Sequence, residues 1–273
     1  MKLVAWVSAA LLLVIVLLLA APFTALGTRY MVSLIDGLDR VSVDYRGGSL
    51  FGDLELTRVH LDLPVLQVEL TELQTRLRLE CFWTSRFCLS RADIGALAMN
   101  VVPGDGATGT EDPRSSEMLE FPYPVQIDSL KVGEVSFTWP GGEWRQARLF
   151  ASVDIQSGEI RVKQALVEDA QLRLDPGEQA EATYAGFVPP ALFLPLALQV
   201  DSLDLQRGSF LQGEQRTELD AVQLSARWRG SVLAVQSLAV DLPAWGRMDL
   251  AGELHFEHAW PMDFQASIAT APG

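Results

Sequence analysis

The sequence predicts an all-β protein, an elongated and curled antiparallel or mixed β-sheet groove, preceded by one N-terminal transmembrane helix. Three observations lead to this fold class. The chain begins with a long uncharged apolar segment, most of the rest alternates apolar and polar residues with the period of a strand, and one six-residue pattern recurs along it.

The apolar segment Leu3–Ala21 has 19 residues and no charge. As a helix it would be about 28 Å long, close to the hydrocarbon thickness of a bilayer. A cleavable signal has a shorter apolar core, although Ala25-Leu26-Gly27 has the small residues of a cleavage site. The length favours an uncleaved anchor over residues 1–28. Lys2 on its amino side predicts a cytoplasmic N-terminus with the bulk of the chain across the membrane.

Composition excludes several function classes. The 273 residues include 35 Asp and Glu against 21 Lys and Arg, a net charge of -14, which argues against nucleic acid because phosphate binding needs clustered cations. Three His and two Cys without metal-ligand spacing predict no metal and no cofactor. The sequence has no Gly-x-Ser-x-Gly elbow, phosphate-binding glycine loop or His-Glu-x-x-His pair, so we expect no enzyme.

The two cysteines, Cys81 and Cys88, enclose six residues in an otherwise Cys-free chain. This arrangement suits a small disulfide loop in an oxidising compartment. Two free buried thiols are the alternative.

Alternation of apolar and polar residues begins after the anchor, and it slips by one residue at Thr71-Glu72, as a β-bulge or a tight corner requires. One pattern recurs: an apolar residue, two mostly polar residues, an apolar residue, a spacer and a third apolar residue. It starts at Leu56, Leu89, Ile127, Val162, Val200 and Val235, with spacings of 33, 38, 35, 38 and 35 residues. The spacing predicts an array of similar units, although any strand-rich protein produces such patterns by chance.

Two stretches rich in Pro, Gly and acidic residues interrupt this array. They predict a division into a first β unit with the cysteine loop at 29–102, an acidic linker at 103–124, a second β unit at 125–174, a Pro-rich linker at 175–195 and a third β unit at 196–273 that continues in a longer protein.

The apolar face of the strands has two interpretations. In a closed sandwich it is ordinary core. Val32–Leu38 is the one candidate for an amphipathic helix that would cover this face. The other interpretation is therefore an open trough that holds lipid acyl chains. Its lining candidates are Val59, Leu61, Val68, Leu77, Ile127, Val132, Val200 and Leu205. A third hypothesis is a scaffold that binds other nascent proteins by strand addition at exposed edges, without carrying lipid.

The segment Leu79–Leu89, Leu-Glu-Cys-Phe-Trp-Thr-Ser-Arg-Phe-Cys-Leu, resembles the cysteine loop near the N-terminus of the TamB family. Further agreement comes from Gly47–Leu50, from Pro122–Ile127 after the acidic linker, and from Trp260–Phe264. The similarity covers essentially the whole chain in order.

This resemblance implies a tapered β-groove related to AsmA-like lipid-transfer proteins (a β-taco), anchored in the bacterial inner membrane and extending through the periplasm. It implies roles in phospholipid transport to the outer membrane and in outer-membrane protein assembly, including autotransporter secretion, within the translocation and assembly module. The implied partners are phospholipid acyl chains and a TamA-like barrel of the Omp85 class. Family members are several times longer, so the chain is expected to be an N-terminal portion without the C-terminal region that meets the barrel.

Overall fold

A computed structural model describes residues 20–36, 40–63, 66–101, 121, 123–174, 193–213, 215–243, 246–256 and 260–270. The predicted anchor lies outside the described residues up to position 19, and so does most of each predicted linker. Within the described ranges no helix has the length and hydropathy needed to cross a bilayer.

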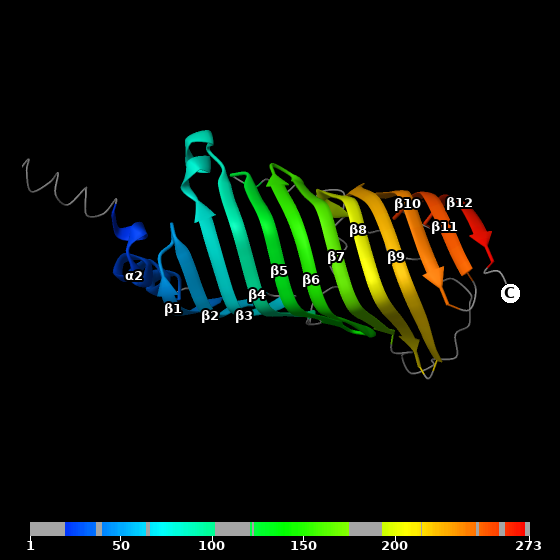
Figure 1. The fold of residues 1–273 in the computed structure, drawn as a ribbon, viewed down its shortest axis with the longest axis horizontal. Helices are drawn as coiled ribbons and strands as arrows, with labels where there is room; N and C mark the ends of the chain where they lie inside the picture. The colour runs from blue at the N-terminus through cyan, green and yellow to red at the C-terminus, as the bar shows by residue number, and fades with distance from the viewer. Residues whose placement is uncertain are drawn as a thin grey trace, which may run out of the picture.

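Twelve strands form a single sheet, and their order in the sheet is their order in the chain (Figure 1). A short 3-10 helix η1 (Ala21–Phe23) and the helix α2 (Ala25–Ile35) precede it, and the 3-10 helix η2 (Leu79–Thr84) interrupts it. The strands are β1 (Val41–Gly48), β2 (Asp53–Asp62), β3 (Leu66–Arg78), β4 (Phe87–Val101), β5 (Val125–Trp139), β6 (Gly142–Gln156), β7 (Glu159–Leu174), β8 (Leu194–Gln212), β9 (Gln215–Gly230), β10 (Val232–Leu242), β11 (Gly246–His255) and β12 (Met262–Ala269).

Neighbouring strands are antiparallel except at two joints, β4–β5 and β7–β8, which are parallel. Parallel neighbours need a long connection because the chain must return to the same end of the sheet. The predicted linkers at 103–124 and 175–195 fall at these two connections. The three predicted β units are therefore hydrogen-bonded to one another in one continuous mixed sheet, as the fold class anticipates.

The strand registers align the apolar residues into rows that run across the sheet. One row contains Val132, Leu149, Val167 and Leu205, each paired with the next. Another contains Ile127, Val153, Val162 and Val200. Further apolar residues pair in the same way, and within each straight stretch of strand the rows lie on one face because alternate residues point the same way.

The recurrent six-residue pattern corresponds to a line of β-bulges. In β4, β5, β7, β8 and β10 the register shifts by one residue at the two polar positions of the pattern, for example between Ile127 and Leu130 or between Val200 and Leu203. A bulge adds one residue to one strand of a pair and bends it. The extra residue keeps the apolar residues before and after it on one face, which explains the irregular spacing in the sequence.

Five of the six occurrences stack beside one another along this bulge line. The spacing of 38 residues is the register offset of both parallel joints, so Leu89 pairs with Ile127 and Val162 with Val200. The first occurrence, Leu56–Leu61 in β2, is not equivalent to the others. It lies at a second line of irregular pairing, which begins in β2.

The second line is a corner that crosses the sheet from β2 to β9. Each strand has a residue missing from the ladder without any change of register there. Glu72, Asp169 and Arg207 on this line have positive φ, at 54°, 55° and 59°. The slip predicted at Thr71-Glu72 is thus a tight corner. At the same line in β5, a Cβ on Gly133 would lie 2.5 Å from the carbonyl oxygen of Gly95, so the backbones approach closely.

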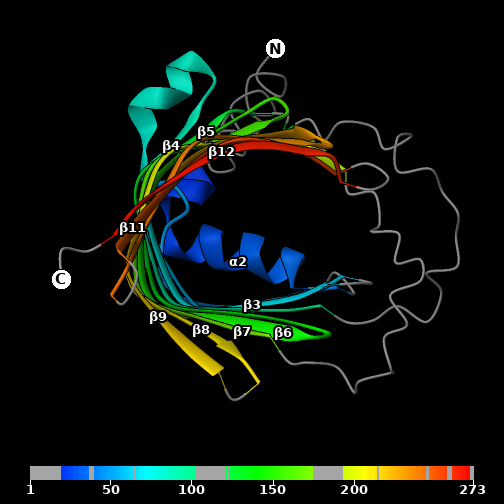
Figure 2. The same cartoon turned by 90° about the vertical axis from the view of Figure 1, so that its right-hand side faces the viewer.

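Viewed along its long axis, the sheet has a C-shaped cross-section (Figure 2). The apolar face is the concave one. Val167 and Ala170 lie on opposite sides of the corner line in β7, yet both belong to one buried cluster with Leu205. A bend brings together side chains on its inner side and separates those on its outer side. The helix α2 adjoins β1 at the end of the sheet and lies within the outline of the C (Figures 1 and 2).

Candidate functional site

All eight residues predicted to line a groove lie in the rows of the concave face. Leu61 pairs with Val68, and Val59 with Leu70, on one side of the corner line. On the other side, Leu77, Ile127 and Val200 belong to one row, and Val132 and Leu205 belong to another. The topology therefore places on one face of the sheet residues that are up to 146 positions apart in the chain, from Val59 in β2 to Leu205 in β8.

Burial on this face is incomplete. Val132 is 3% exposed and Leu205 is 8% exposed, because both lie close to the bend, where the two walls meet. The other six candidates are only half-buried. The described residues contribute no second sheet and no helix other than α2 to cover the face, so a long run of apolar side chains remains in part accessible. Such a surface is rare in a monomeric soluble protein.

One polar pair interrupts the apolar rows and has no signal in the sequence. Gln146 is 6% exposed and lies between Val135 and Ala170 in its row. Its Oε1 accepts a hydrogen bond of 3.1 Å from the indole Nε1 of Trp144. A buried indole N–H normally has an acceptor, and Gln146 supplies one on the concave face.

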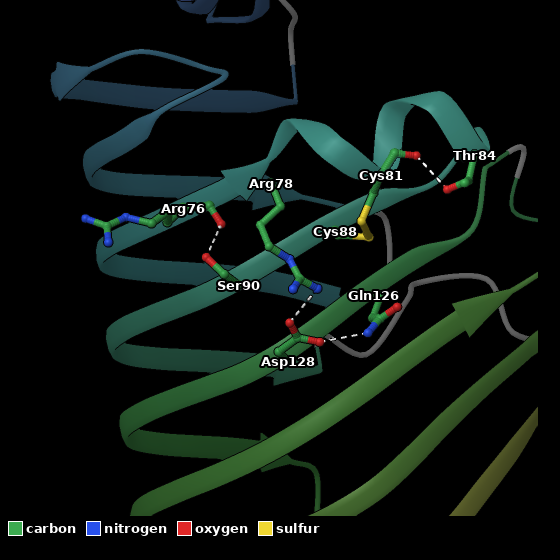
Figure 3. Close-up of a disulfide and its surroundings, with 8 residues drawn as sticks. All are labelled: Arg76, Arg78, Cys81, Thr84, Cys88, Ser90, Gln126 and Asp128. Atoms are coloured by element: carbon green, nitrogen blue, oxygen red, sulfur yellow. Dashed lines mark hydrogen bonds and ion pairs between the residues drawn. A yellow bond between two sulfur atoms is a disulfide. The ribbon is translucent and has the colours of Figure 1, made fainter.

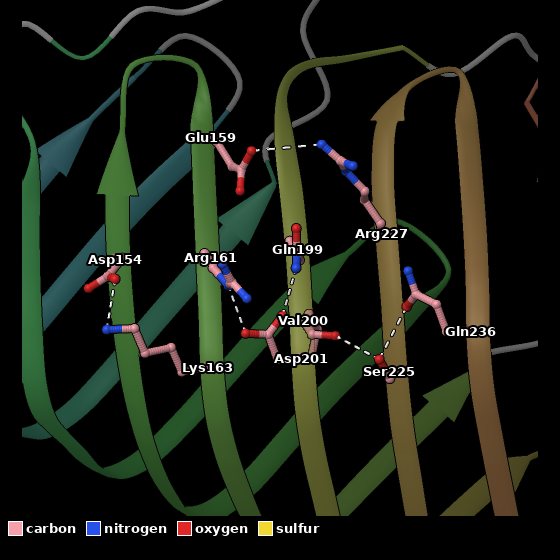
Figure 4. Close-up of polar contacts among 10 residues, drawn as sticks. All are labelled: Asp154, Glu159, Arg161, Lys163, Gln199, Val200, Asp201, Ser225, Arg227 and Gln236. Carbon is pink, nitrogen blue, oxygen red and sulfur yellow. Dashed lines mark hydrogen bonds and ion pairs between the residues drawn. The ribbon is translucent and has the colours of Figure 1, made fainter.

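The convex face carries the charged residues, and it repeats the same contact at two places. The sequence Gln-Ile-Asp-Ser-Leu at 126–130 recurs as Gln-Val-Asp-Ser-Leu at 199–203. In both copies the Gln Nε2 donates to the Asp Oδ1 at 2.7 Å. Arg78 contacts Asp128, and Arg161 contacts Asp201, each at 2.7 Å (Figures 3 and 4).

Hydrogen bonds from Arg161 and then from Gln199 hold the pKa of the Asp201 carboxyl below its ordinary value. We call each Arg–Asp–Gln contact a clamp. The first clamp connects β3 with β5, on the far side of the parallel pair β4–β5, and the second connects the parallel neighbours β7 and β8. No hairpin joins the strands of either parallel pair. Both ion pairs are in part exposed, so solvent screens the attraction between their charges. The two contacts link strands of the sheet on its convex face.

A hollow of about 410 Å³ lies beside the first clamp, lined by twelve residues that include Asp128, Ser152, Gln164 and Asp204. It is a shallow depression beside the bulge line, and its lining includes the bulge residues Ser129, Gln164 and Ser202. Among the described residues, no group of three or more His, Cys, Asp or Glu is placed to hold a metal ion.

The predicted disulfide is present. Cys81 and Cys88 are bonded with an S–S distance of 2.05 Å, and the six residues between them include the second half of η2, residues 82–84 (Figure 3). Thr84 Oγ1 donates to the carbonyl oxygen of Cys81 at 2.8 Å, which closes the turn. The loop projects from the rim of the sheet between β3 and β4 (Figure 1), and the side chain of Trp83 on it is 94% exposed.

The sequence matches the family described as TamB, N-terminal domain, over residues 11–271. The chain belongs to the TamB family. No curated protein and no solved structure matches it. The TamB match covers the whole described sheet, and it includes the disulfide loop on which the resemblance of the sequence chiefly rests. The predicted anchor and both predicted linkers fall partly or wholly within the matched residues as well.

Proposed function

We propose that this chain is the membrane-proximal part of a TamB-type protein, anchored in the inner membrane through residues 3–21, whose concave face carries phospholipid acyl chains through the periplasm toward the outer membrane. The proposed role includes assembly of outer-membrane proteins, among them autotransporters, with a TamA-like barrel as the outer-membrane partner. It requires no catalysis, metal or cofactor.

One observation carries this proposal: apolar rows cross most strands of a single-layered sheet, and many of their side chains away from the bend are only half-buried. Each methylene moved from water onto such a face contributes about 0.8 kcal/mol. A few engaged carbons are therefore enough to hold a chain without a site for the polar headgroup. Because the rows are continuous across the strands, a chain can shift along them without losing contact.

The dimensions agree with this role. Twelve strands at about 4.8 Å spacing make the sheet about 50 Å long across the strands. An acyl chain occupies about half of the roughly 30 Å hydrocarbon thickness of a bilayer. The described sheet thus accommodates more than one acyl chain along its length, as a continuous path requires.

Photo-crosslinking tests the proposal directly. A photoreactive amino acid replaces Ile127 or Leu205 on the concave face, and Gln206, which is exposed and adjacent to Leu205, provides the matched position on the convex face. We expect phospholipid adducts at Ile127 and Leu205, detected by mass spectrometry after irradiation in cells. Equal labelling of Gln206, or no lipid at any position, contradicts the proposal.

A second candidate function rests on β12, the last strand of the described sheet. Among the described strands β12 pairs only with β11, and seven of its eight residues are exposed. A strand paired on one side can bind an added strand through backbone hydrogen bonds. As a scaffold, the chain would hold a nascent outer-membrane protein at this edge and carry no lipid.

Charged substitutions separate the two functions. Leu205→Glu places a carboxylate among the apolar rows, whereas Gln206→Glu places one on the convex face. Loss of lipid adducts and of function in Leu205→Glu alone supports the carrier, provided that the disulfide loop and the sheet still form. Retained function, with crosslinks from β12 to barrel proteins, favours the scaffold.

A further inference from the structure

The helix α2 has two faces, and only one of them is used by the sheet. On the inner face, Thr28 is 1% exposed, and its Oγ1 accepts a hydrogen bond from the backbone N–H of Leu50 at 2.9 Å. Val32 on the same face is buried. Asp36, which caps the helix, accepts a hydrogen bond from the N–H of Val43 in β1 at 3.0 Å. This face fixes α2 against the edge of the sheet.

The opposite face presents Leu26, Tyr30 and Leu34, which are 82%, 68% and 60% exposed. They are spaced by four residues and so form one stripe along the helix. The only charged residue within α2 is Arg29. The exposed face of a helix on a soluble protein is normally charged or polar. An uncharged stripe of this kind needs a partner.

The preceding residues identify that partner as a lipid bilayer. Residues 3–21 are uncharged and long enough to span one, and only three residues separate Ala21 from the start of α2 at Ala25. At no more than about 3.6 Å per residue, the start of α2 lies within about 14 Å of the end of that segment. Tyr30 has the amphipathic ring that favours the membrane interface, and the stem of Arg29 can extend toward the headgroups.

The junction between the segment and the sheet is braced. The carbonyl oxygen of Pro22 accepts a hydrogen bond of 3.4 Å from the N–H of Phe51, and the ring of Phe23 lies 4.8 Å from that of Phe51. Both contacts attach η1 to the turn between β1 and β2. The chain therefore has no slack there that would let α2 move away from a bilayer containing residues 3–21.

We propose that the outer face of α2, formed by Leu26, Tyr30 and Leu34, lies in the interface of the membrane that anchors the chain. The helix then holds β1, the first strand of the sheet, beside the membrane surface. This inference rests on the anchor of the proposed function, and it adds a second membrane contact that the anchor alone does not require.

Depth-dependent fluorescence quenching tests the inference on the whole chain in phosphatidylcholine nanodiscs. With the disulfide intact, a polarity-sensitive fluorophore is attached at Leu34→Cys, at Leu11→Cys within the anchor, or at Glu218→Cys on β9. Phosphatidylcholine with a nitroxide near its ester groups serves as the quencher for Leu34 and Glu218, and phosphatidylcholine with a nitroxide near the end of an acyl chain serves as the quencher for Leu11. We expect several-fold stronger quenching at Leu34 than at Glu218, together with quenching at Leu11.

The other outcomes overturn different statements. Quenching at Leu11 with none at Leu34 overturns the inference about α2 and leaves the anchor in place. The same holds if Leu34 is not quenched and instead crosslinks to a second copy of the chain. Absence of quenching at both Leu11 and Leu34 overturns the anchor and the inference together.

A paired variant isolates the apolar side chains. Leu26→Gln combined with Leu34→Gln keeps residues that favour a helix and changes only exposed positions, so the sheet is expected to fold unchanged. A fluorophore at Tyr30→Cys should then lose quenching several-fold, while Ser33→Gln leaves it unaltered. Unchanged quenching in the paired variant overturns the inference.

Discussion

Asp169 and Arg207 face each other across the parallel joint β7–β8, and both have the left-handed backbone conformation. Their φ angles are 55° and 59°, and two hydrogen bonds connect them, from Nε to Oδ1 at 2.6 Å and from a terminal guanidinium nitrogen to Oδ2 at 3.1 Å. Non-glycine residues adopt this conformation at a cost of about 1–2 kcal/mol each. The pair connects β7 and β8 at the corner line, where Asp169 and Arg207 are missing from the backbone ladder between the two strands.

This pair predicts a pH dependence. The hydrogen bonds from Arg207 lower the pKa of the Asp169 carboxyl below its ordinary value of 3.8. A lowered pKa in the folded state stabilises the fold at pH values above the ordinary one, and the contribution disappears as the pH falls through the folded value. In Arg207→Gln we expect the Asp169 titration, followed by carboxyl carbon NMR, to move upward toward the ordinary value.

The matched control is Arg216→Gln, which removes a different exposed ion pair, that with Glu218 on β9. It should leave the Asp169 titration where it is. An unchanged midpoint for Asp169 in Arg207→Gln would show that the guanidinium is not the cause of the shift.

The corner line also depends on glycine at one close approach. In Gly133→Ala the new methyl group would lie 2.5 Å from the carbonyl oxygen of Gly95, which is backbone and cannot rotate away. We expect a loss of about 1–3 kcal/mol in the free energy of unfolding, as for other overpacked sites. Urea denaturation followed by tryptophan fluorescence measures it.

Gly47→Ala in β1 is the comparison, because nothing lies within 4 Å of the added atom. It should be neutral or stabilise the protein by up to about 1 kcal/mol through the unfolded chain. Equal effects of the two substitutions would refute the steric account of the corner.

Burial in the bend predicts where the concave face tolerates truncation. Leu205→Ala removes a side chain from the buried cluster with Val167 and Ala170, and we expect a loss of about 2 kcal/mol, the lower end of the range for such changes. Ile268→Ala on β12, where the side chain is 71% exposed, should change stability by less than about 0.5 kcal/mol. A loss for Leu205→Ala as small as that of Ile268→Ala would mean that the bend is not packed in solution.

The disulfide closes a loop of eight residues from Cys81 to Cys88. The loop-entropy relation gives about 2.5 kcal/mol of stabilisation for that length. Replacement of both cysteines by serine should lower the unfolding midpoint in urea, and treatment of the unmodified chain with dithiothreitol should lower it equally. If neither treatment moves the midpoint, the loop is held by its other contacts, such as the hydrogen bond of Thr84.

Local patterns in the sequence predicted much of this fold because they reflect contacts over short distances. The alternation after residue 53, the slip at Thr71-Glu72 and the close pair of cysteines each depend on neighbours within a few residues. The polar pair of Trp144 and Gln146 was not predicted. Counted back from Leu149 by strict alternation, Gln146 would lie on the polar face. The corner between Gln146 and Leu149 shifts the alternation by one residue and places Gln146 on the concave face. The apolar stripe of α2 was missed too, since the sequence placed the amphipathic helix at Val32–Leu38, whereas it spans Ala25–Ile35.

By itself, the sequence determined that this protein is a strand array with one apolar face, a short disulfide loop and the features of the TamB family. Only the tertiary structure decided that five repeats share one bulge line, that two joints are parallel, and that the apolar face is the concave one. These facts depend on register between strands that are 38 or more residues apart in the chain, at Leu89 and Ile127 or at Val162 and Val200. Period-two alternation specifies which residues share a face, but it contains no information about which distant strand pairs with which, or toward which side the sheet bends.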